Sequence, residues 1–376
     1  MIHFSNYLSW RGDLDFRAVP PGETDVAIFA KLAYFPFPES LKGDGEGKAT
    51  LKSVYESSFD RALELPPLLQ DTAELLALAA GSSRFGRVRM CEYVDRLDPS
   101  NLIQFSAVTF LVSSRIGVIA FRGTDDSLTG WREDFQLAFK PNMPSQTYAA
   151  DYIRHCAKTY PNLRWIICGH SKGGNLAVYG ASQQTEEIKQ KISAVYDFDG
   201  PGFREEFLNS ESFLSILGIL RHYIPEASVV GCLFEHRGRT TVVRADERGI
   251  RQHNLATWQI MGPSFIEAES RTRDSIQIEH SIKAWTQDMT EEETEAFVNS
   301  LFDLFSISEI SKFSELSKLN VNGLKLLTKG TSEQRKSIQS GLGKLLFELY
   351  RTYFPKFSPK KNKEIESAEL PSKGGK

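Results

Sequence analysis

The segment around Ser171 has the residue types and spacing of a serine hydrolase nucleophile. Ser171 is the centre of a G-x-S-x-G motif, after an apolar run at 164–168 and before the helix-forming run 175–179. A strand, a sharp turn and a helix in this order form a nucleophile elbow, in which the serine hydroxyl projects above the sheet edge. A chance motif in a glycine-bearing turn is the alternative, but the flanking elements and the additional Gly174 favour the elbow.

An acyl-transfer site also needs N–H donors for the oxyanion that develops on the substrate. The helix that follows Ser171 offers the backbone N–H of Lys172 and the positive end of its dipole. The second donor comes from a loop after an earlier strand. Thr124 has that position, directly after the predicted strand 116–121, although a plain turn with Asp125 as a helix cap would explain the same residues.

These motifs together resemble the fungal-type (class 3) lipases. The likeness rests on residues 118–124 (VIAFRGT), on Trp131 and Asp134, and on residues 169–177 (GHSKGGNLA). More closely, the chain is similar to the Mbeg1-like family of bacterial hydrolase-like proteins, through residues 7–13 (YLSWRGD), residues 197–203 (DFDGPGF) and the Gln252-His253 region. The resemblance covers residues 5 to 305 and implies an α/β-hydrolase fold and ester rather than amide hydrolysis.

A serine hydroxyl needs a neighbouring base, usually a histidine that a carboxylate orients, and in α/β-hydrolases the chain order is serine, acid, histidine. Four histidines follow the serine: His222, His236, His253 and His280. We expect the first inside a strand, the second in a solvated turn and the last near a helix start. His253 follows the last predicted strand, where the loop should deliver the base, and class 3 lipases also place the catalytic histidine in a late loop.

Two carboxylates compete for the role of triad acid. Glu226 directly follows the predicted strand 220–224, which is the topological place of the lipase acid. Lipases generally have aspartate there, and members of the Mbeg1-like family often have a non-acidic residue. Asp199 follows the strand that ends at Phe198, also at the carboxyl edge of the sheet, where active sites form. Its alternative role is to hold the turn at 200–202, and we place Glu226 slightly ahead of it.

The pattern of elements predicts an α/β-hydrolase-like fold with a mostly parallel central sheet. Short strands at 88–94, 104–112 and 116–121 form a meander. Alternation then begins, and its elements are strands at 164–168, 192–198, 217–224 and 240–244 with helices at 148–159 and 173–184. Strands that alternate with helices imply a parallel sheet covered on both faces.

Further segments flank this core, which we expect over residues 81–275. Residues 1–80 form a helical and loop extension that packs on the core, with helices at 25–34 and 71–80. Residues 276–355 form C-terminal helices and 356–376 a polar, disordered tail. The segment 203–220 is an amphipathic lid over an acyl site or, as the preferred interpretation, a sheet-covering helix.

Composition excludes several function classes. The net charge of −3 offers no attraction to nucleic acid. Four widely spaced cysteines without a C-x-x-C pair form neither a zinc site nor a disulfide framework, which favours a reducing compartment. The acids do not cluster with histidines along the chain, so we predict no metal and no cofactor. The chain lacks a secretory signal pattern and an apolar run of membrane-spanning length, and we expect a cytoplasmic protein that could still touch a membrane surface.

The sequence therefore predicts a serine esterase or lipase-like hydrolase that acts on a small acyl ester or lipid-like substrate. Ser171 would attack, His253 would act as base, Glu226 or Asp199 would orient it, and Thr124 and Lys172 would bind the oxyanion. A catalytically inactive binding scaffold is the main alternative. A thioesterase or acyltransferase with the same triad is another, because pocket shape decides the acyl acceptor. The oligomeric state stays open.

Overall fold

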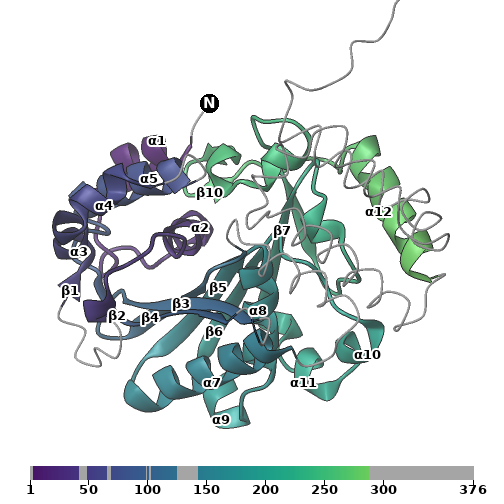
Figure 1. Ribbon diagram of the computed structural model, residues 1–376, viewed down its shortest axis with the longest axis horizontal. Helices are drawn as coiled ribbons and strands as arrows, with labels where there is room; N and C mark the ends of the chain where they lie inside the picture. Colours follow the sequence, from purple (N-terminus) through teal and green to yellow (C-terminus); the bar gives the residue numbers. More distant parts are fainter. Residues whose placement is uncertain are drawn as a thin grey trace, which may run out of the picture.

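A computed structural model describes residues 3–41, 49–65, 69–98, 100, 103–124 and 143–287. Within these ranges one sheet has eight strands that neighbour each other in chain order (Figure 1). The strands are β1 (Ala49–Thr50), β2 (Arg89–Asp98), β3 (Ile103–Leu111), β4 (Ile116–Phe121), β5 (Arg164–His170), β6 (Ile192–Phe198), β7 (Leu220–Pro225) and β8 (Thr240–Val243). Strands β1 to β4 pair antiparallel and β4 to β8 pair parallel, which confirms the predicted α/β fold with a meander leading into a parallel half.

Helices cover both faces of this sheet. Figure 1 shows α2 and α5 on one side, and α7, α8 and α9 on the other. The helices are α1 (Phe4–Arg11), α2 (Glu23–Leu32), α3 (Leu51–Ser57), α4 (Phe59–Leu63), α5 (Gln70–Gly81), α7 (Pro144–Thr159), α8 (Lys172–Ser182), α9 (Glu186–Lys189), α10 (Glu205–Leu208), α11 (Glu211–Leu214) and α12 (Arg273–Gln287). Along β6 the side chains alternate, so that Phe198 joins the hydrophobic cluster under α2 and Val195 joins the cluster under α8.

The segment 203–220 is neither a single helix nor one continuous lid. It forms the one-turn helices α10 and α11, followed by a 3-10 turn at Leu217–Ile219, so β7 starts only at Leu220. Ser210 separates the two helices, because its hydroxyl accepts a hydrogen bond from Phe213 N at 3.3 Å and starts a new helix. Phe207 stacks on Tyr179 of α8, so this segment does cover the α8 side of the sheet, as the preferred interpretation expected.

The N-terminal segment contributes to the core of the sheet. Helix α2 is buried from Thr24 to Leu32. At its first turn the carboxylate of Asp25 accepts two hydrogen bonds from Arg84, both at 2.7 Å, and one from the Tyr7 hydroxyl at 2.8 Å. Arg84 also donates to the backbone oxygen of Leu14 at 2.7 Å. This buried ion pair ties α1, α2 and the residues after α5 into one packed layer.

Substitution of Arg84 by methionine is expected to lower the free energy of unfolding by about 3–5 kcal/mol, because the buried Asp25 carboxylate loses its countercharge. Arg17→Met is the matched control, since the Arg17–Asp15 pair lies at the surface, where solvent screens it and its loss should change stability little. Urea unfolding followed by circular dichroism measures both. Equal costs for the two substitutions would contradict the interpretation of the buried pair.

Several sequence expectations lie outside the described residues. Trp131 and Asp134 are among them, as are the predicted helices beyond Gln287 and the tail at 356–376. Helix α12 is the part of the C-terminal helical region that the structure describes. No helix in the described ranges is long and apolar enough to cross a bilayer.

Candidate active site

Ser171 sits in the sharp turn between β5 and α8, with φ +58° and ψ −134°. A positive φ is uncommon for a residue with a side chain, and such strain concentrates at functional sites. Two backbone hydrogen bonds hold the turn: Ser171 N donates to Phe198 O at 2.9 Å and Gly174 N donates to Ser171 O at 2.8 Å. The first of these bonds connects the turn to the end of β6.

The glycines of the motif are required by close backbone approach. A Cβ on Gly169 would lie 2.0 Å from Gly173 O, and a Cβ on Gly173 would lie 2.2 Å from Phe121 O. Real Cβ atoms do not come this close, so both positions exclude any side chain. The G-x-S-x-G pattern thus follows from the packing of β5, α8 and the end of β4.

The loop after β4 passes directly over Ser171. A Cβ on Gly123 would lie 2.9 Å from Ser171 Cβ and 2.5 Å from His170 O. Thr124, the next residue, is half-buried and ends this described stretch of chain. On the other side of Ser171, Lys172 is the first residue of α8, and its side chain turns away to donate from Nζ to the backbone oxygen of Gln104 at 2.9 Å. Gly123, which precedes Thr124, and Lys172 are therefore both next to the serine.

Asp199 and His253 are directly hydrogen-bonded through their side chains. His253 Nδ1 lies 2.6 Å from Asp199 Oδ2. The other carboxylate oxygen, Oδ1, accepts hydrogen bonds from Ser228 Oγ at 2.5 Å and from Gly231 N at 3.0 Å. Asp199 is fully buried at the end of β6, with φ +51°, and these contacts orient its carboxylate toward the histidine.

Glu226 lies at the end of β7 as expected, but Asp199 is the carboxylate that hydrogen-bonds His253. The backbone of Glu226 is used in packing: its N–H donates to Val243 O at 3.0 Å and its carbonyl accepts from Thr272 N at 2.7 Å. Within the described chain, no hydrogen bond or ion pair connects the Glu226 side chain to the site.

His170, inside the motif, connects the nucleophile turn to the histidine loop, a role that the sequence analysis did not assign. Its Nε2 lies 2.7 Å from the backbone oxygen of His253, and its Nδ1 lies 2.8 Å from the Tyr34 hydroxyl. A carbonyl only accepts hydrogen bonds, so the neutral ring carries its proton on Nε2, and Tyr34 donates to Nδ1. Burial lowers the pKa of His170 well below 6.5, and His253 and Lys31 lower it further.

The residue after the candidate base is anchored to the N-terminal helices. Asn254 Nδ2 donates to Asp71 Oδ2 at 2.7 Å, and Asn254 Oδ1 accepts from Lys31 Nζ at 3.1 Å. Lys31 and Asp71 form an ion pair at 3.0 Å that closes this triangle. Helices α2 and α5 therefore fix the loop that carries His253.

Substitution of His170 by phenylalanine is expected to lower the free energy of unfolding at pH 7.5 by about 1–3 kcal/mol, because the Tyr34 hydroxyl and the His253 carbonyl each lose a partner. The cost should shrink as pH falls below about 6.5. Below that pH, His170 binds a proton in the unfolded wild type, whereas the buried ring of the folded protein stays neutral. This difference lowers the free energy of unfolding of the wild type by up to about 1.4 kcal/mol per pH unit. The variant has no imidazole at this position and does not lose this stability. Chemical unfolding of both proteins at several pH values measures this; a cost that does not change with pH would argue against a neutral His170.

The other three candidate histidines lie on other elements. His222 is buried within β7, as predicted, and His280 lies in the middle of α12 rather than at its start. His236 is half-buried, and its ring stacks on His222 with centroids 4.0 Å apart, so the prediction of a solvated turn is wrong. Asp197, His222 and His236 form a cluster, which corrects the expectation that no acid lies with histidines; spacing along the chain could not reveal it because tertiary packing of β6, β7 and a loop brings them together.

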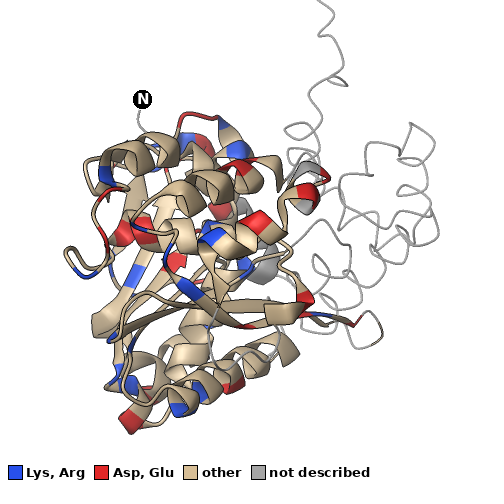
Figure 2. Cartoon of the chain, turned by 90° about the vertical axis from the view of Figure 1, so that its left-hand side faces the viewer, with Lys and Arg blue, Asp and Glu red and all other residues tan. Residues whose placement is uncertain are grey.

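Figure 2 shows Lys and Arg positions interspersed with Asp and Glu positions along the helices. The net charge of the sequence is −3.

Comparisons with known proteins identify a family for the chain. The Mbeg1-like family model matches residues 79–303, more than half of the chain. Among solved structures, a Rhizomucor miehei lipase in complex with its propeptide shares 21% identity and covers 42% of this chain, with a TM-score of 0.33. A fungal lipase–inhibitor complex shares 15% identity over 58% of the chain with a TM-score of 0.38, and M37 lipase shares 16% over 57% with a TM-score of 0.35. The matched regions span 57%, 77% and 70% of those three chains, respectively. No curated protein matches the sequence at a significant level.

Proposed function

The chain belongs to the Mbeg1-like family, and we propose that it is a serine hydrolase that cleaves carboxylic esters through Ser171, His253 and Asp199. The observation that carries the proposal is the 2.6 Å contact between His253 Nδ1 and the buried Asp199 Oδ2. A carboxylate in that position holds the imidazole in the tautomer whose Nε2 can accept a proton. Asp199 therefore takes precedence over Glu226 in the proposed triad.

The proposed reaction is acyl transfer to water in two steps. The Ser171 hydroxyl attacks the ester carbonyl while His253 Nε2 accepts its proton, and that proton then passes to the departing alcohol. A water molecule, deprotonated by the same histidine, releases the acid and restores the serine. Asp199 stabilises the imidazolium that forms in each step, and no cofactor takes part.

The oxyanion would form where Ser171, Thr124 and Lys172 meet. The proximity of Gly123 to Ser171 Cβ supports Thr124 as a donor, because the loop after β4 then reaches the attacked carbonyl. The N–H of Lys172 at the first position of α8 supplies the other donor, as in a nucleophile elbow. Each hydrogen-bond donor to the oxyanion contributes a factor of about 10²–10³ to kcat.

Within the described residues, Ser171 Oγ makes no hydrogen bond. Catalytic hydrogen bonds are often long in free enzymes and shorten when substrate binds, so this geometry is compatible with the proposed base. The same observation motivates a second candidate, a hydrolase-like scaffold that binds an ester or another ligand without turnover. The two candidates differ in whether the serine is activated.

The substrate class that we propose is a small acyl ester or a lipid-like ester, by similarity to the lipases alone. A cytoplasmic, reducing location is also proposed, since all four cysteines are free and buried in the structure. A thioesterase or acyltransferase would use the same groups, and the acceptor specificity distinguishes these enzymes from an esterase.

Labelling with a fluorophosphonate probe tests the proposal. We expect the wild-type protein to gain one covalent label, located on Ser171 by peptide mass spectrometry, and His253→Ala to lose it because the base is removed. A panel of p-nitrophenyl esters of rising chain length and the corresponding thioesters then reports acyl and leaving-group preference. A correctly folded wild-type protein that neither labels nor turns over any of these substrates would support the binding scaffold instead.

A further inference from the structure

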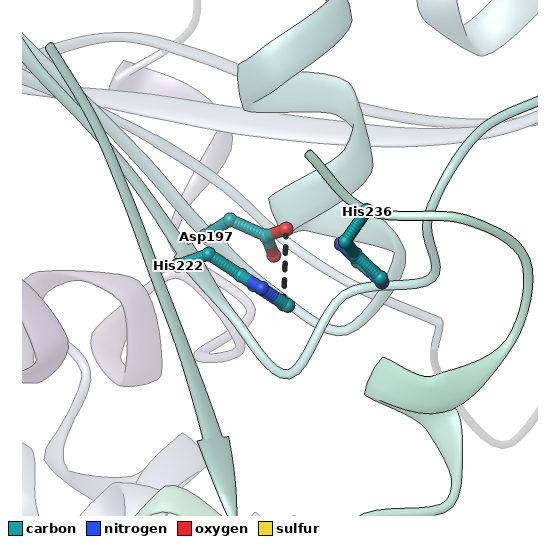
Figure 3. Close-up of side chains that lie close together, drawn as sticks. All are labelled: Asp197, His222 and His236. Atoms are coloured by element: carbon teal, nitrogen blue, oxygen red, sulfur yellow. Dashed lines mark ion pairs between the residues drawn. The ribbon is translucent and has the colours of Figure 1, made fainter. Parts of the chain in front are cut away.

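A second group of chemically active side chains lies on the face of the sheet opposite the His253 loop. Asp197 comes from β6, His222 from the neighbouring β7, and His236 from the loop that precedes β8 (Figure 3). Asp197 and His222 are 2% and 4% exposed, and His236 is half-buried. The proposed hydrolase mechanism uses none of the three.

The geometry of the cluster does not correspond to ordinary hydrogen bonding. His222 Nε2 lies 3.7 Å from Asp197 Oδ2, which is longer than a hydrogen bond, and it makes no hydrogen bond to any residue that the structure describes. Burial of a ring nitrogen without a hydrogen-bond partner is unfavourable for the free energy of folding. Two ligand atoms on one tetrahedral Zn²⁺, each about 2.0–2.1 Å from the ion, are about 3.4 Å apart. That distance is close to the 3.7 Å between His222 Nε2 and Asp197 Oδ2.

We propose that Asp197, His222 and His236 bind one divalent transition-metal ion, with Zn²⁺ as the first candidate. One nitrogen or oxygen atom from each residue lies within 4.8 Å of the other two, so modest side-chain rotation, chiefly of His236, brings all three to one ion. Two imidazoles and a carboxylate favour Zn²⁺, Co²⁺ or Ni²⁺ over Mg²⁺ and Ca²⁺, which prefer oxygen ligands.

The surroundings of two of the ligands resemble the outer shell of metal sites. His222 Nδ1 lies 3.0 Å from Thr240 Oγ1, and when Nδ1 donates that hydrogen bond the Nε2 lone pair faces the cluster. Asp197 Oδ1 accepts from Gly200 N at 3.0 Å, which leaves Oδ2 directed at the histidine. Arg237 lines the same hollow, and its guanidinium donates to Leu208 O at 3.3 Å and to Asn209 Oδ1 at 2.8 Å, so that it is engaged away from the ligands.

The position of the cluster suggests a structural role for the ion. A Cβ on Gly174 would lie 2.0 Å from Asp197 Oδ1, and a Cβ on Gly200 would lie 2.4 Å from it. Gly174 belongs to the turn that holds Ser171, and Gly200 follows Asp199. An ion on Asp197 would therefore stabilise β6 and β7 directly behind the candidate active site, without touching a substrate there.

The test is metal binding by the untagged full-length chain, measured by isothermal titration with ZnCl₂ and by metal analysis after dialysis. We expect about one Zn²⁺ per chain and a thermal midpoint that rises with Zn²⁺ concentration, because the ion binds the folded state. His222→Gln and His236→Gln should each weaken binding by at least about tenfold. His280→Gln is the matched control, since that exposed histidine on α12 lies outside the cluster.

Two results would overturn the proposal: no binding of Zn²⁺, Co²⁺ or Ni²⁺ by the folded wild type, or binding that survives both cluster substitutions. Because His236 is half-buried, its substitution leaves a folded protein for the comparison even if His222→Gln destabilises the chain. Titration of the Ser171→Ala variant should give the wild-type affinity. The metal proposal can thus fail or hold independently of the proposed hydrolase activity.

Discussion

Replacement of Ser171 by alanine is expected to lower kcat for ester hydrolysis by about 10⁶-fold and to abolish fluorophosphonate labelling, since the nucleophile of a cooperating triad is lost. The turn should keep its conformation, because its two backbone hydrogen bonds do not use the hydroxyl. Kinetics with the best ester from the panel, together with circular dichroism, measure the change.

Ser182→Ala is the control for this substitution. Ser182 is also buried and also belongs to the α8 segment, but its hydroxyl donates to Tyr179 O at 2.8 Å, far from the elbow along the helix. Its variant should keep the wild-type rate within a few-fold. Equal rates for wild type and Ser171→Ala would remove the serine from the mechanism.

Substitution of Asp199 by asparagine is expected to lower kcat by about 10⁴-fold, the size of effect seen when a triad acid no longer fixes the histidine tautomer. Glu226→Gln, the same chemical change on the competing carboxylate, should leave kcat nearly unchanged. The contrast follows from the 2.6 Å contact of Asp199 with His253.

The pair of substitutions distinguishes the two assignments in either direction. A large loss of kcat in Glu226→Gln, together with wild-type activity in Asp199→Asn, would assign the role of triad acid to Glu226. Unfolding measurements accompany both variants, because Asp199 also accepts hydrogen bonds from Ser228 and Gly231 and its substitution has a stability cost.

Much of the fold follows from local sequence pattern. Strands β4 and β6 have the predicted bounds, and β5 extends only two residues further than expected. The reason is that apolar runs between turn residues are strong local signals, and alternation of strands and helices restricts the topology. The elbow was also predictable from local sequence, because the positions around Ser171 where a Cβ would come within 3 Å of backbone atoms must be glycine.

The choice between Asp199 and Glu226 depended on tertiary structure. Both follow a parallel strand and reach the same sheet edge, so chain order could not separate them. Only the packed loop after β7, which supplies hydrogen bonds to Asp199 Oδ1, directs that carboxylate toward His253. The link between His170 and the His253 backbone is 83 residues long in sequence and leaves no local pattern.

The sequence by itself thus identified the strands, the nucleophile turn and the histidine loop as candidates, because residue types within a short stretch of chain mark each of them. The tertiary structure alone decided which carboxylate meets His253, how α2 and α5 anchor that loop through Asn254, and that Asp197, His222 and His236 come together. These are contacts between segments far apart in the chain, and their side-chain directions are set by packing of the whole domain.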